Sequence, residues 1–493
     1  MNATVELAGN MQAWAFPRDY VRGNSRLRNG QGLSGTVDAL LQYLRADNAI
    51  ITAVSRKFED AGNAVEPWYG TRFRTRPLAQ QPRWLRVPAA PGLGLPDPNP
   101  FLPRNLELKA LKSKPSSKNA IVLPESKIEK VWEAFFTQDT EYGVPKAFAF
   151  IELRTKLPRS SARAAVCARI YESMFRQALQ ETLLYDAEVA GLTFAFSTSM
   201  RGVELFFGGF DDRLSDFAST ALGELLAFDV AKNAQGFRAQ ADLLQRELES
   251  VDTQEPFKQA SYWSGLATLV DEISFKELQA ALAGLKASDV ATFASALWAS
   301  PVVGLSLCEG NLRQDEADSL ISNVRNLLKS ENFLAAPESE WPVPRVAKVP
   351  VNSFGQGVVL VHQITDPTEE NSAVELSFQA GSTRSGSAED LKRLSELQVL
   401  SAILSDEFYE ELRARQQLGY VVSCRLDRGE GAFRLVFLVQ GAVLGPMEVL
   451  DRMDAFIKSG MSLIDAKSER DIAALADSLA QDMRSLSDAL RNC

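Results

Sequence analysis

A long internal repeat constrains this chain more than any other feature. KAFAFIEL at 146–153 and VELSFQAG at 374–381 each predict a strand, followed by an apolar-periodic helix and then by glycine, strand, turn and strand. The same 228 residues separate Gly191 from Gly419 and Phe150 from Phe378. Because solenoid repeats span only about 20–50 residues, this period indicates duplicated domains. We predict an α+β fold in which each copy packs its helices on one face of a mostly antiparallel sheet.

Two proline-rich stretches divide the sequence. Seven prolines lie between residues 86 and 118, and three lie between 335 and 346. Dense proline in loop-like sequence is typical of extended linkers. The predicted organisation is therefore a first piece at 1–85, a linker at 86–118, one copy at 119–335 and the second copy at 347–493.

Both ends of the chain resemble interrupted domains. LLQYLRADNAIITAVS at 40–55 predicts a helix followed by a strand, like TFASALWASPVVGLSL at 292–307, which closes the first copy. The last residues trace a helical apolar stripe that runs to Cys493 without a closing strand. We expect residue 1 to fall inside a domain and the second copy to be truncated.

Composition excludes several classes of function. The net charge is −10, with 53 basic and 63 acidic residues, which gives no support for nucleic-acid binding. No run of about 18 apolar residues predicts a transmembrane helix, and the first residues do not form a signal peptide. The four cysteines are far apart and form no CxxC pair. We expect a cytoplasmic chain with neither a membrane nor a nucleic-acid partner.

Histidine is nearly absent. His362 is the only one, so an HExxH or HxxEH zinc pair cannot exist in this sequence. It lies in the apolar run VVLVHQI, which predicts a strand, and no partner for a general-base role is evident. No phosphate-binding loop of the GxxxxGK[ST] type is present either.

Four further stretches carry a family resemblance. They are, in order, EPWYGTRF (66–73), NPFLPRNLEL (99–108), VPKAFAFIEL (144–153) and LRARQQLGYVV (412–422). Together they resemble the insulysin branch of the pitrilysin-type (M16) zinc metallopeptidases, over almost the whole chain. The resemblance implies duplicated M16-type (LuxS/metallohydrolase-like) domains. By the same resemblance, 1–85 is the remnant of the second domain, 86–118 the inter-half linker, 119–335 the third domain and 347–493 a truncated fourth.

The resemblance also implies a function. In that family two halves enclose a chamber that holds a peptide, and the HxxEH zinc motif lies in the first of four domains. This sequence contains no part of that domain, so we expect the substrate-chamber half of an insulysin-like zinc metalloendopeptidase, inactive alone. We expect no metal or cofactor in this chain and zinc in the missing N-terminal half. The expected partners are a peptide substrate and that zinc-bearing half or a homologous subunit.

The segment ELRARQQLGYVV carries the candidate site. The resemblance implies that Arg413 and Tyr420 reach the bound peptide and assist the zinc site. A Tyr hydroxyl can donate a hydrogen bond to the carbonyl oxygen on which charge develops, and an Arg offers a fork of donors. We expect Gly419 to leave the helix with a positive φ and to let a peptide approach closely. A purely structural alternative is that the Arg caps helix carbonyls and the Tyr packs its ring.

The internal repeat bears on that choice. Subtracting 228 places Tyr185 at the position of Arg413 and Leu192 at that of Tyr420, so the first copy lacks the pair. Weaker candidates are an acidic cluster of Glu181, Asp186 and Glu188, and the pair Trp68 and Tyr69, which we interpret as a solvated face and a linker anchor.

Two other functions stay open. The chain could be a zinc-free subunit that serves a zinc-bearing partner in trans, or a degenerate peptide-binding or scaffold protein of the same family. A homo-oligomer is left open too.

Overall fold

The computed structural model describes residues 11, 34–44, 48–55, 57, 62–75, 77, 97–109, 125–129, 131–139, 142–337, 340–342, 359–382, 388–428 and 432–492. The chain forms two compact units, Met1–Asp97 and Pro98–Cys493. The predicted bounds between linker, first copy and second copy stay a prediction. Within these described residues, no helix combines the length and apolarity needed to cross a membrane.

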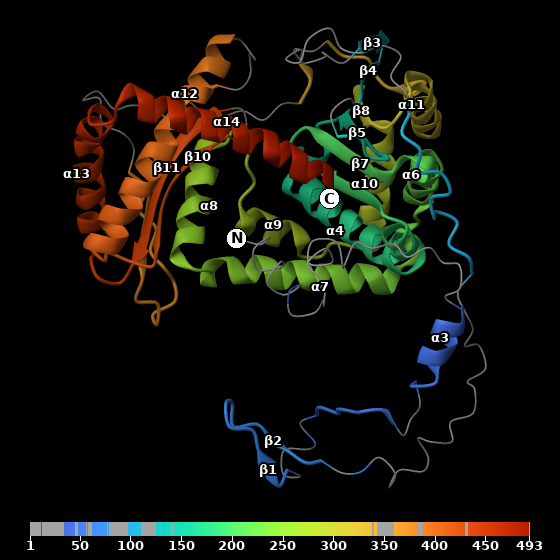
Figure 1. Ribbon diagram of the computed structural model, residues 1–493, viewed down its shortest axis with the longest axis horizontal. Coiled ribbons are helices and arrows are strands. Elements are labelled where there is room, and N and C mark those ends of the chain that lie inside the picture. The colour runs from blue at the N-terminus through green and yellow to red at the C-terminus, as the bar shows by residue number, and fades with distance from the viewer. Residues whose placement is uncertain are drawn as a thin grey trace. The chain divides into compact units, whose positions relative to one another are not determined.

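The first unit has little regular structure in its described part. It contains helix α3 (Ser34–Leu41) and a short hairpin of β1 (Ala64–Val65) and β2 (Arg72–Phe73) (Figure 1). The strand predicted within 40–55 is wrong, because the described residues 48–55 form none. Ile50 and Val54 are exposed there, and no described strand pairs with them.

The second unit begins with a six-stranded sheet built by the first copy. Its strand order is β3 (Glu125–Glu129), β4 (Trp132–Gln138), β8 (Val303–Gly310), β5 (Lys146–Arg154), β7 (Gly202–Phe210) and β6 (Leu192–Thr198). Every neighbouring pair is antiparallel except β4 with β8. The predicted α+β class with mostly antiparallel sheets is confirmed.

Helices cover one face of this sheet. They include α4 (Ala162–Leu179), α6 (Asp211–Ala227), α7 (Ala234–Ser250), α9 (Phe275–Leu282), α10 (Ala287–Ala299) and α11 (Gln314–Leu328). Helix α4 begins where the Ser161 hydroxyl accepts a hydrogen bond from the Ala164 N–H. Its predicted stripe of Val166, Ile170 and Met174 is fully buried, and each such side chain contributes roughly 1.5–3 kcal/mol of burial free energy.

The opposite face of the six-stranded sheet is also partly apolar. Phe150 of β5 lies opposite Phe206 on one side and Leu307 on the other, and Phe150 and Leu307 are more than one third exposed. Ala149 and Ile151 of the same strand are fully buried beneath the helices. Strand β5 is therefore apolar on both faces.

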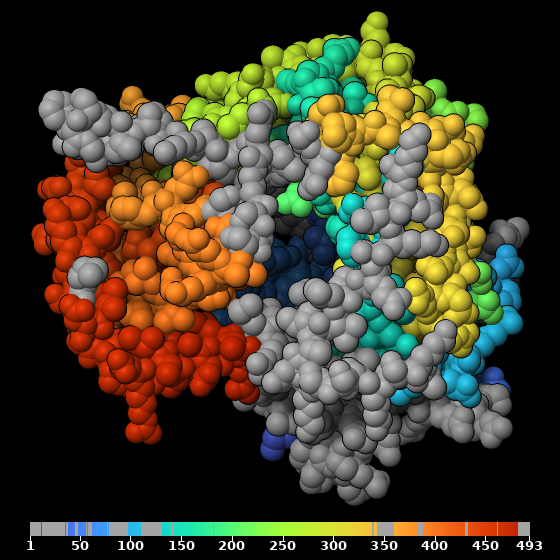
Figure 2. Space-filling model, turned by 90° about the horizontal axis from the view of Figure 1, so that it is seen from above, coloured from blue at the N-terminus to red at the C-terminus, as the bar shows by residue number. Residues whose placement is uncertain are grey.

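The second copy forms a three-stranded antiparallel sheet in the order β10 (Val421–Asp427), β11 (Ala432–Gly441) and β9 (Ser372–Ser382). Helices α12 (Ala388–Phe408) and α13 (Pro446–Asp465) pack on one face, and α14 (Glu469–Asn492) follows. The rings of Phe408, Phe437 and Phe456 form the centre of this core. Figure 2 shows the first copy in teal to yellow and the second in orange to red.

A helix of the first copy covers the other face of the second sheet. Helix α8 (Pro256–Thr268) lies along β9 and β11, where Val436 and Leu438 are 1% and 3% exposed (Figure 1). Hydrogen bonds join the two copies here: Phe257 N–H to Gln440 Oε1 at 2.8 Å, Ser261 Oγ to Glu375 Oε2 at 2.5 Å and Arg434 Nη1 to Thr268 Oγ1 at 3.0 Å. The second sheet is therefore enclosed on both faces.

The strand registers of the two copies correct the predicted repeat. Phe207 of β7 lies 228 residues before Leu435 of β11. Ala149 is the partner of Phe207, whereas Phe378 is the partner of Leu435. Phe378 is thus equivalent to Ala149 and not to Phe150, so the predicted register is wrong by one residue at this strand. A one-residue shift moves every side chain to the opposite face.

The described part of the linker lies against the first copy. The Arg104 N–H donates to Asp212 Oδ2 at 2.8 Å. The Lys109 ammonium lies 2.8 Å from Asp211 Oδ2 and 2.9 Å from Glu316 Oε2, and only Asp211 is fully buried. This ion triplet fixes the linker to the start of α6 and α11.

His362 does not lie in a strand, because the described residues 359–371 have none; this prediction is wrong. Its ring stacks on Trp263 of α8, with the ring centroids 4.5 Å apart. The contact with a helix of the first copy explains its position without a sheet neighbour.

Candidate functional site

The candidate segment is the connection between α12 and β10. Helix α12 continues directly into a π-helical segment, η11 (Tyr409–Arg415), a wide helical turn that is rare and often marks functional sites. Leu412 is fully buried and Leu418 is 3% exposed, so both anchor the segment in the second core. The Leu418 N–H donates to the Leu412 carbonyl at 3.0 Å, which closes the turn.

The left-handed residue of this turn is Gln417, with a φ of 53°. The prediction that Gly419 adopts a positive φ is wrong, because the chain has already reversed two residues earlier. The equivalent glycine of the first copy, Gly191, does have a positive φ of 72°. The two copies therefore leave their helices by different backbone routes.

Gly419 is instead needed for a close approach to β11. A Cβ atom at this position would lie 2.6 Å from the Gln440 carbonyl carbon and 2.8 Å from the Gly441 Cα, well inside van der Waals contact. Only glycine allows the backbone to pass so near another strand. The glycine places Tyr420 at the start of β10.

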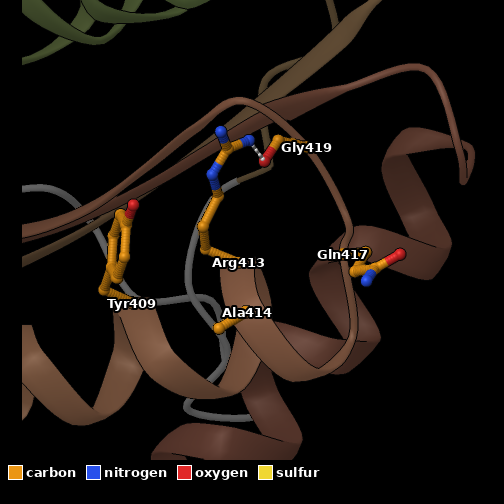
Figure 3. Close-up of a pocket in the computed structure, with 5 residues that line it drawn as sticks. All are labelled: Tyr409, Arg413, Ala414, Gln417 and Gly419. Carbon is orange, nitrogen blue, oxygen red and sulfur yellow. Dashed lines mark hydrogen bonds between the residues drawn. The ribbon is translucent and has the colours of Figure 1, made fainter.

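Arg413 and Tyr420 are brought together. The Arg413 guanidinium carbon lies 4.7 Å from the centroid of the Tyr420 ring, and its Nη1 donates to the Gly419 carbonyl oxygen (Figure 3). Such stacking contributes about 0.5–1 kcal/mol at an exposed site. Tyr420 is 82% exposed, so its hydroxyl faces away from the core. The Arg caps a carbonyl beyond the helix while its aromatic partner stays accessible.

These residues line a pocket of about 490 Å³. The lining residues are Tyr409, Arg413, Ala414, Gln417 and Gly419. Figure 3 shows the side chains of Tyr409 and Arg413 on the same side of η11, whereas Gln417 points to the other side. The sequence reasoning missed Tyr409, although its position four residues before Arg413 places both on one face of a helix.

The acidic residues of η11 are paired elsewhere. Arg415 lies 3.7 Å from Glu410 and 3.1 Å from Glu411, and the Gln416 side chain donates to Glu411 at 2.9 Å. The hydrogen bond from Gln416, followed by that from Arg415, holds the pKa of Glu411 below its usual value. Glu411 is therefore ionised and tied to the end of the helix.

The first copy shows that the fold does not require an exposed Tyr. Leu192 of β6, at the position of Tyr420, is 2% exposed and belongs to the first core. The exposure of Tyr420 is a property of the second copy alone.

The weaker candidates gather no comparable site. The Glu181 side chain lies outside the described residues, and the Asp186 carbonyl accepts a hydrogen bond from the Asn99 side chain at 2.6 Å. Trp68 and Tyr69 are 86% and 92% exposed, and Glu66 accepts hydrogen bonds from both of their N–H groups. Their anchoring role stays a prediction.

The zinc that the family resemblance implies does not fit the donors of this chain. His362, the only histidine, stacks on Trp263. No three His, Cys, Asp or Glu side chains of the described residues gather at metal-binding distance. Structural and catalytic zinc sites need three or four such ligands.

Two family models match the sequence. One, described as the middle or third domain of peptidase M16, matches residues 1–281. The other, described as domain 4 of the C-terminal lobe of PqqF-like PQQ synthase, matches residues 399–492.

Curated relatives match over most of the chain. The peroxisomal insulin-degrading enzyme-like 1 of Arabidopsis thaliana is 26% identical over 100% of this chain and 49% of its own length. The insulin-degrading enzyme of Homo sapiens is 24% identical over 89% of this chain and 42% of its own length. The chain thus spans about half the length of the relatives it matches.

Solved structures share the fold. The crystal structure of pitrilysin matches 97% of this chain and 50% of its own, with a TM-score of 0.66 and 18% identity. A peptidase M16 inactive domain from Pseudomonas fluorescens matches 72% of this chain, with a TM-score of 0.50 and 11% identity. These likenesses confirm the predicted M16-type fold.

Proposed function

Because the chain belongs to the peptidase M16 family, with relatives of the insulin-degrading enzyme type, we propose that it is the peptide-contacting half of an insulysin-like zinc metalloendopeptidase. The zinc belongs to residues outside this chain, and the chain alone does not hydrolyse peptides. The predicted family resemblance itself is confirmed.

One observation carries the proposal. Tyr420 is exposed above the Arg413 guanidinium at a pocket, whereas the fold's other copy buries a leucine at the same position. A tyrosine kept accessible, with a cation beneath its ring, is suited to contact a ligand and adds nothing to the core.

The chemistry of the two side chains suits peptide hydrolysis. Negative charge builds on the scissile carbonyl oxygen, and the Tyr420 hydroxyl donates a hydrogen bond to it. Losing one such donor costs on the order of 3 kcal/mol at the transition state. The guanidinium of Arg413 has five N–H donors, of which one is used by Gly419, so others remain for carbonyl groups of a bound peptide.

Reconstitution tests the proposal. The purified chain is mixed with a zinc-bearing M16 half of a curated relative, and cleavage of a quenched fluorogenic peptide is followed with and without a chelator. We expect chelator-sensitive cleavage only in the mixture. Tyr420→Phe should lower kcat/KM by about a hundredfold. Tyr185→Phe removes an exposed hydroxyl of the first copy and should leave kcat/KM unchanged.

Two results would contradict the proposal. Chelator-sensitive cleavage by the chain alone would place the metal in this chain, and full activity of Tyr420→Phe would remove its catalytic role. The alternatives predict different behaviour: a subunit acting in trans co-purifies with a zinc-bearing homologue, and a scaffold protein binds peptides without cleavage in any assembly. An immunoblot of the native protein separates a single longer chain from a separate subunit by its mass.

A further inference from the structure

Arg413 is a half-buried cation without a carboxylate partner among the described residues. Its contacts are the Gly419 carbonyl oxygen and the Tyr420 ring, which are both neutral. The two nearest acids in sequence, Glu410 and Glu411, pair with Arg415 instead. A guanidinium at a pocket wall gains most from a carboxylate, because such charge-assisted hydrogen bonds are about twice as strong as neutral ones.

Tyr409 supplies a second donor beside this cation. It is half exposed, it lines the pocket with Arg413, and its hydroxyl has no hydrogen-bond partner in the described part of the chain. Figure 3 shows both side chains on one side of η11, with a gap between the phenol and the guanidinium. A carboxylate has two oxygens and can accept from both groups at once.

The contacts that Arg413 already makes leave room for such a ligand. The Tyr420 ring covers one face of the guanidinium, and the Gly419 carbonyl takes a single N–H of Nη1. The remaining N–H groups lie along the edge of the planar fork, which is the part that recognises carboxylates. Stacking and the carbonyl bond therefore hold the fork in place for recognition.

We infer that this pocket selects peptides by a carboxylate, which is held between the Arg413 guanidinium and the Tyr409 hydroxyl. The inference rests on the proposed function, since it names the substrate class of the same site. The carboxylate comes either from the C-terminus of a peptide or from an Asp or Glu side chain.

Peptide binding to the 493-residue chain tests the inference. The probes are ten-residue peptides of Ala, Gly, Phe and Gln with an N-terminal fluorescein, and binding is measured by fluorescence anisotropy. One peptide has a C-terminal amide and no acid, one has a free C-terminus, and a series of amides carries a single Glu at successive positions. The free C-terminus and the Glu series distinguish the two sources of carboxylate.

We expect one carboxylate peptide to bind about tenfold to a hundredfold more tightly than the neutral amide. Arg413→Ala should abolish this preference, Arg413→Lys should retain part of it, and Tyr409→Phe should reduce it. Arg452→Ala, which removes an exposed arginine of α13, should leave the preference intact and controls for net charge.

Equal binding of all peptides to the wild-type chain would overturn the inference. If Arg413→Ala still weakened that binding, the proposed function would stand without the carboxylate preference. If no peptide bound at all, both proposals would fail. A preference that survives Arg413→Ala would place the carboxylate at another site.

Discussion

Gly419→Ala should loosen the junction between β10 and β11. The new Cβ would lie 2.6 Å from the Gln440 carbonyl carbon and 2.8 Å from the Gly441 Cα, whereas carbon atoms prefer about 3.5–4.0 Å. The start of β10 must move by about 1 Å to relieve this overlap. That shift strains the first pair of the ladder, Val421 with Gln440. Overpacking of this kind costs about 1–3 kcal/mol.

Hydrogen exchange followed by mass spectrometry measures this cost locally. If β10 and β11 open as one unit, a loss of about 1–3 kcal/mol in opening free energy speeds exchange of their amides about 5-fold to 160-fold. Exchange in α4 of the first copy should be unchanged. The local measurement avoids assuming that a chain of this size unfolds in one step.

Gly460→Ala is the matched control in the same copy. In helix α13 its Cβ would meet Leu404 Cδ2 at 3.5 Å, which is an ordinary contact. Replacing a helix-interior glycine by alanine stabilises by about 0.5–1 kcal/mol, so exchange in α13 should slow. If Gly419→Ala exchanged like the wild type while Gly460→Ala slowed, the close-approach argument for Gly419 would be refuted.

Two further predictions concern the first copy. Burial raises the pKa of Glu172, so its contribution to stability is present below the unfolded pKa, about 4.3, and is lost as pH rises through the folded pKa. Urea midpoints at pH 4 and pH 7 should therefore move in favour of Glu172→Gln at the higher pH, and a constant difference would contradict this. Lys109→Met leaves two carboxylates of the ion triplet unpaired and should destabilise by about 2–3 kcal/mol, less than a fully buried pair because Glu316 is partly exposed. Lys232→Met, at an exposed pair, should change stability by less than about 0.5 kcal/mol in the same urea titration.

The elements with one clear periodicity were predictable from sequence. The alternation in 146–153 predicted β5, and Ser161 with its apolar stripe predicted α4. The register of the repeat was not predictable at β5, because this strand is apolar on both faces and its alternation has no unique phase. The neighbouring strands, which pair Phe207 and Leu435 with different residues, were needed to fix it.

The candidate site was predictable in its residue types but not in its geometry. The sequence placed Arg413 and Tyr420 near each other around a glycine, and the structure stacks them. It could not tell whether Gly419 serves a positive φ or a close approach, since both require the absence of a Cβ. The answer depends on Gly441, which lies far along the chain. The pocket wall formed by Tyr409 likewise depends on the π-helical turn, which no simple residue pattern indicates.

The position of helix α8 has a consequence for how this chain folds. Residues 335–346 separate the two copies in sequence, yet α8 shields Val436 and Leu438 of the second. Without α8, the second sheet would present an apolar surface to water, which favours aggregation. The second copy is therefore not an autonomous folding unit: its sheet reaches a stable state only after the first copy has supplied a wall.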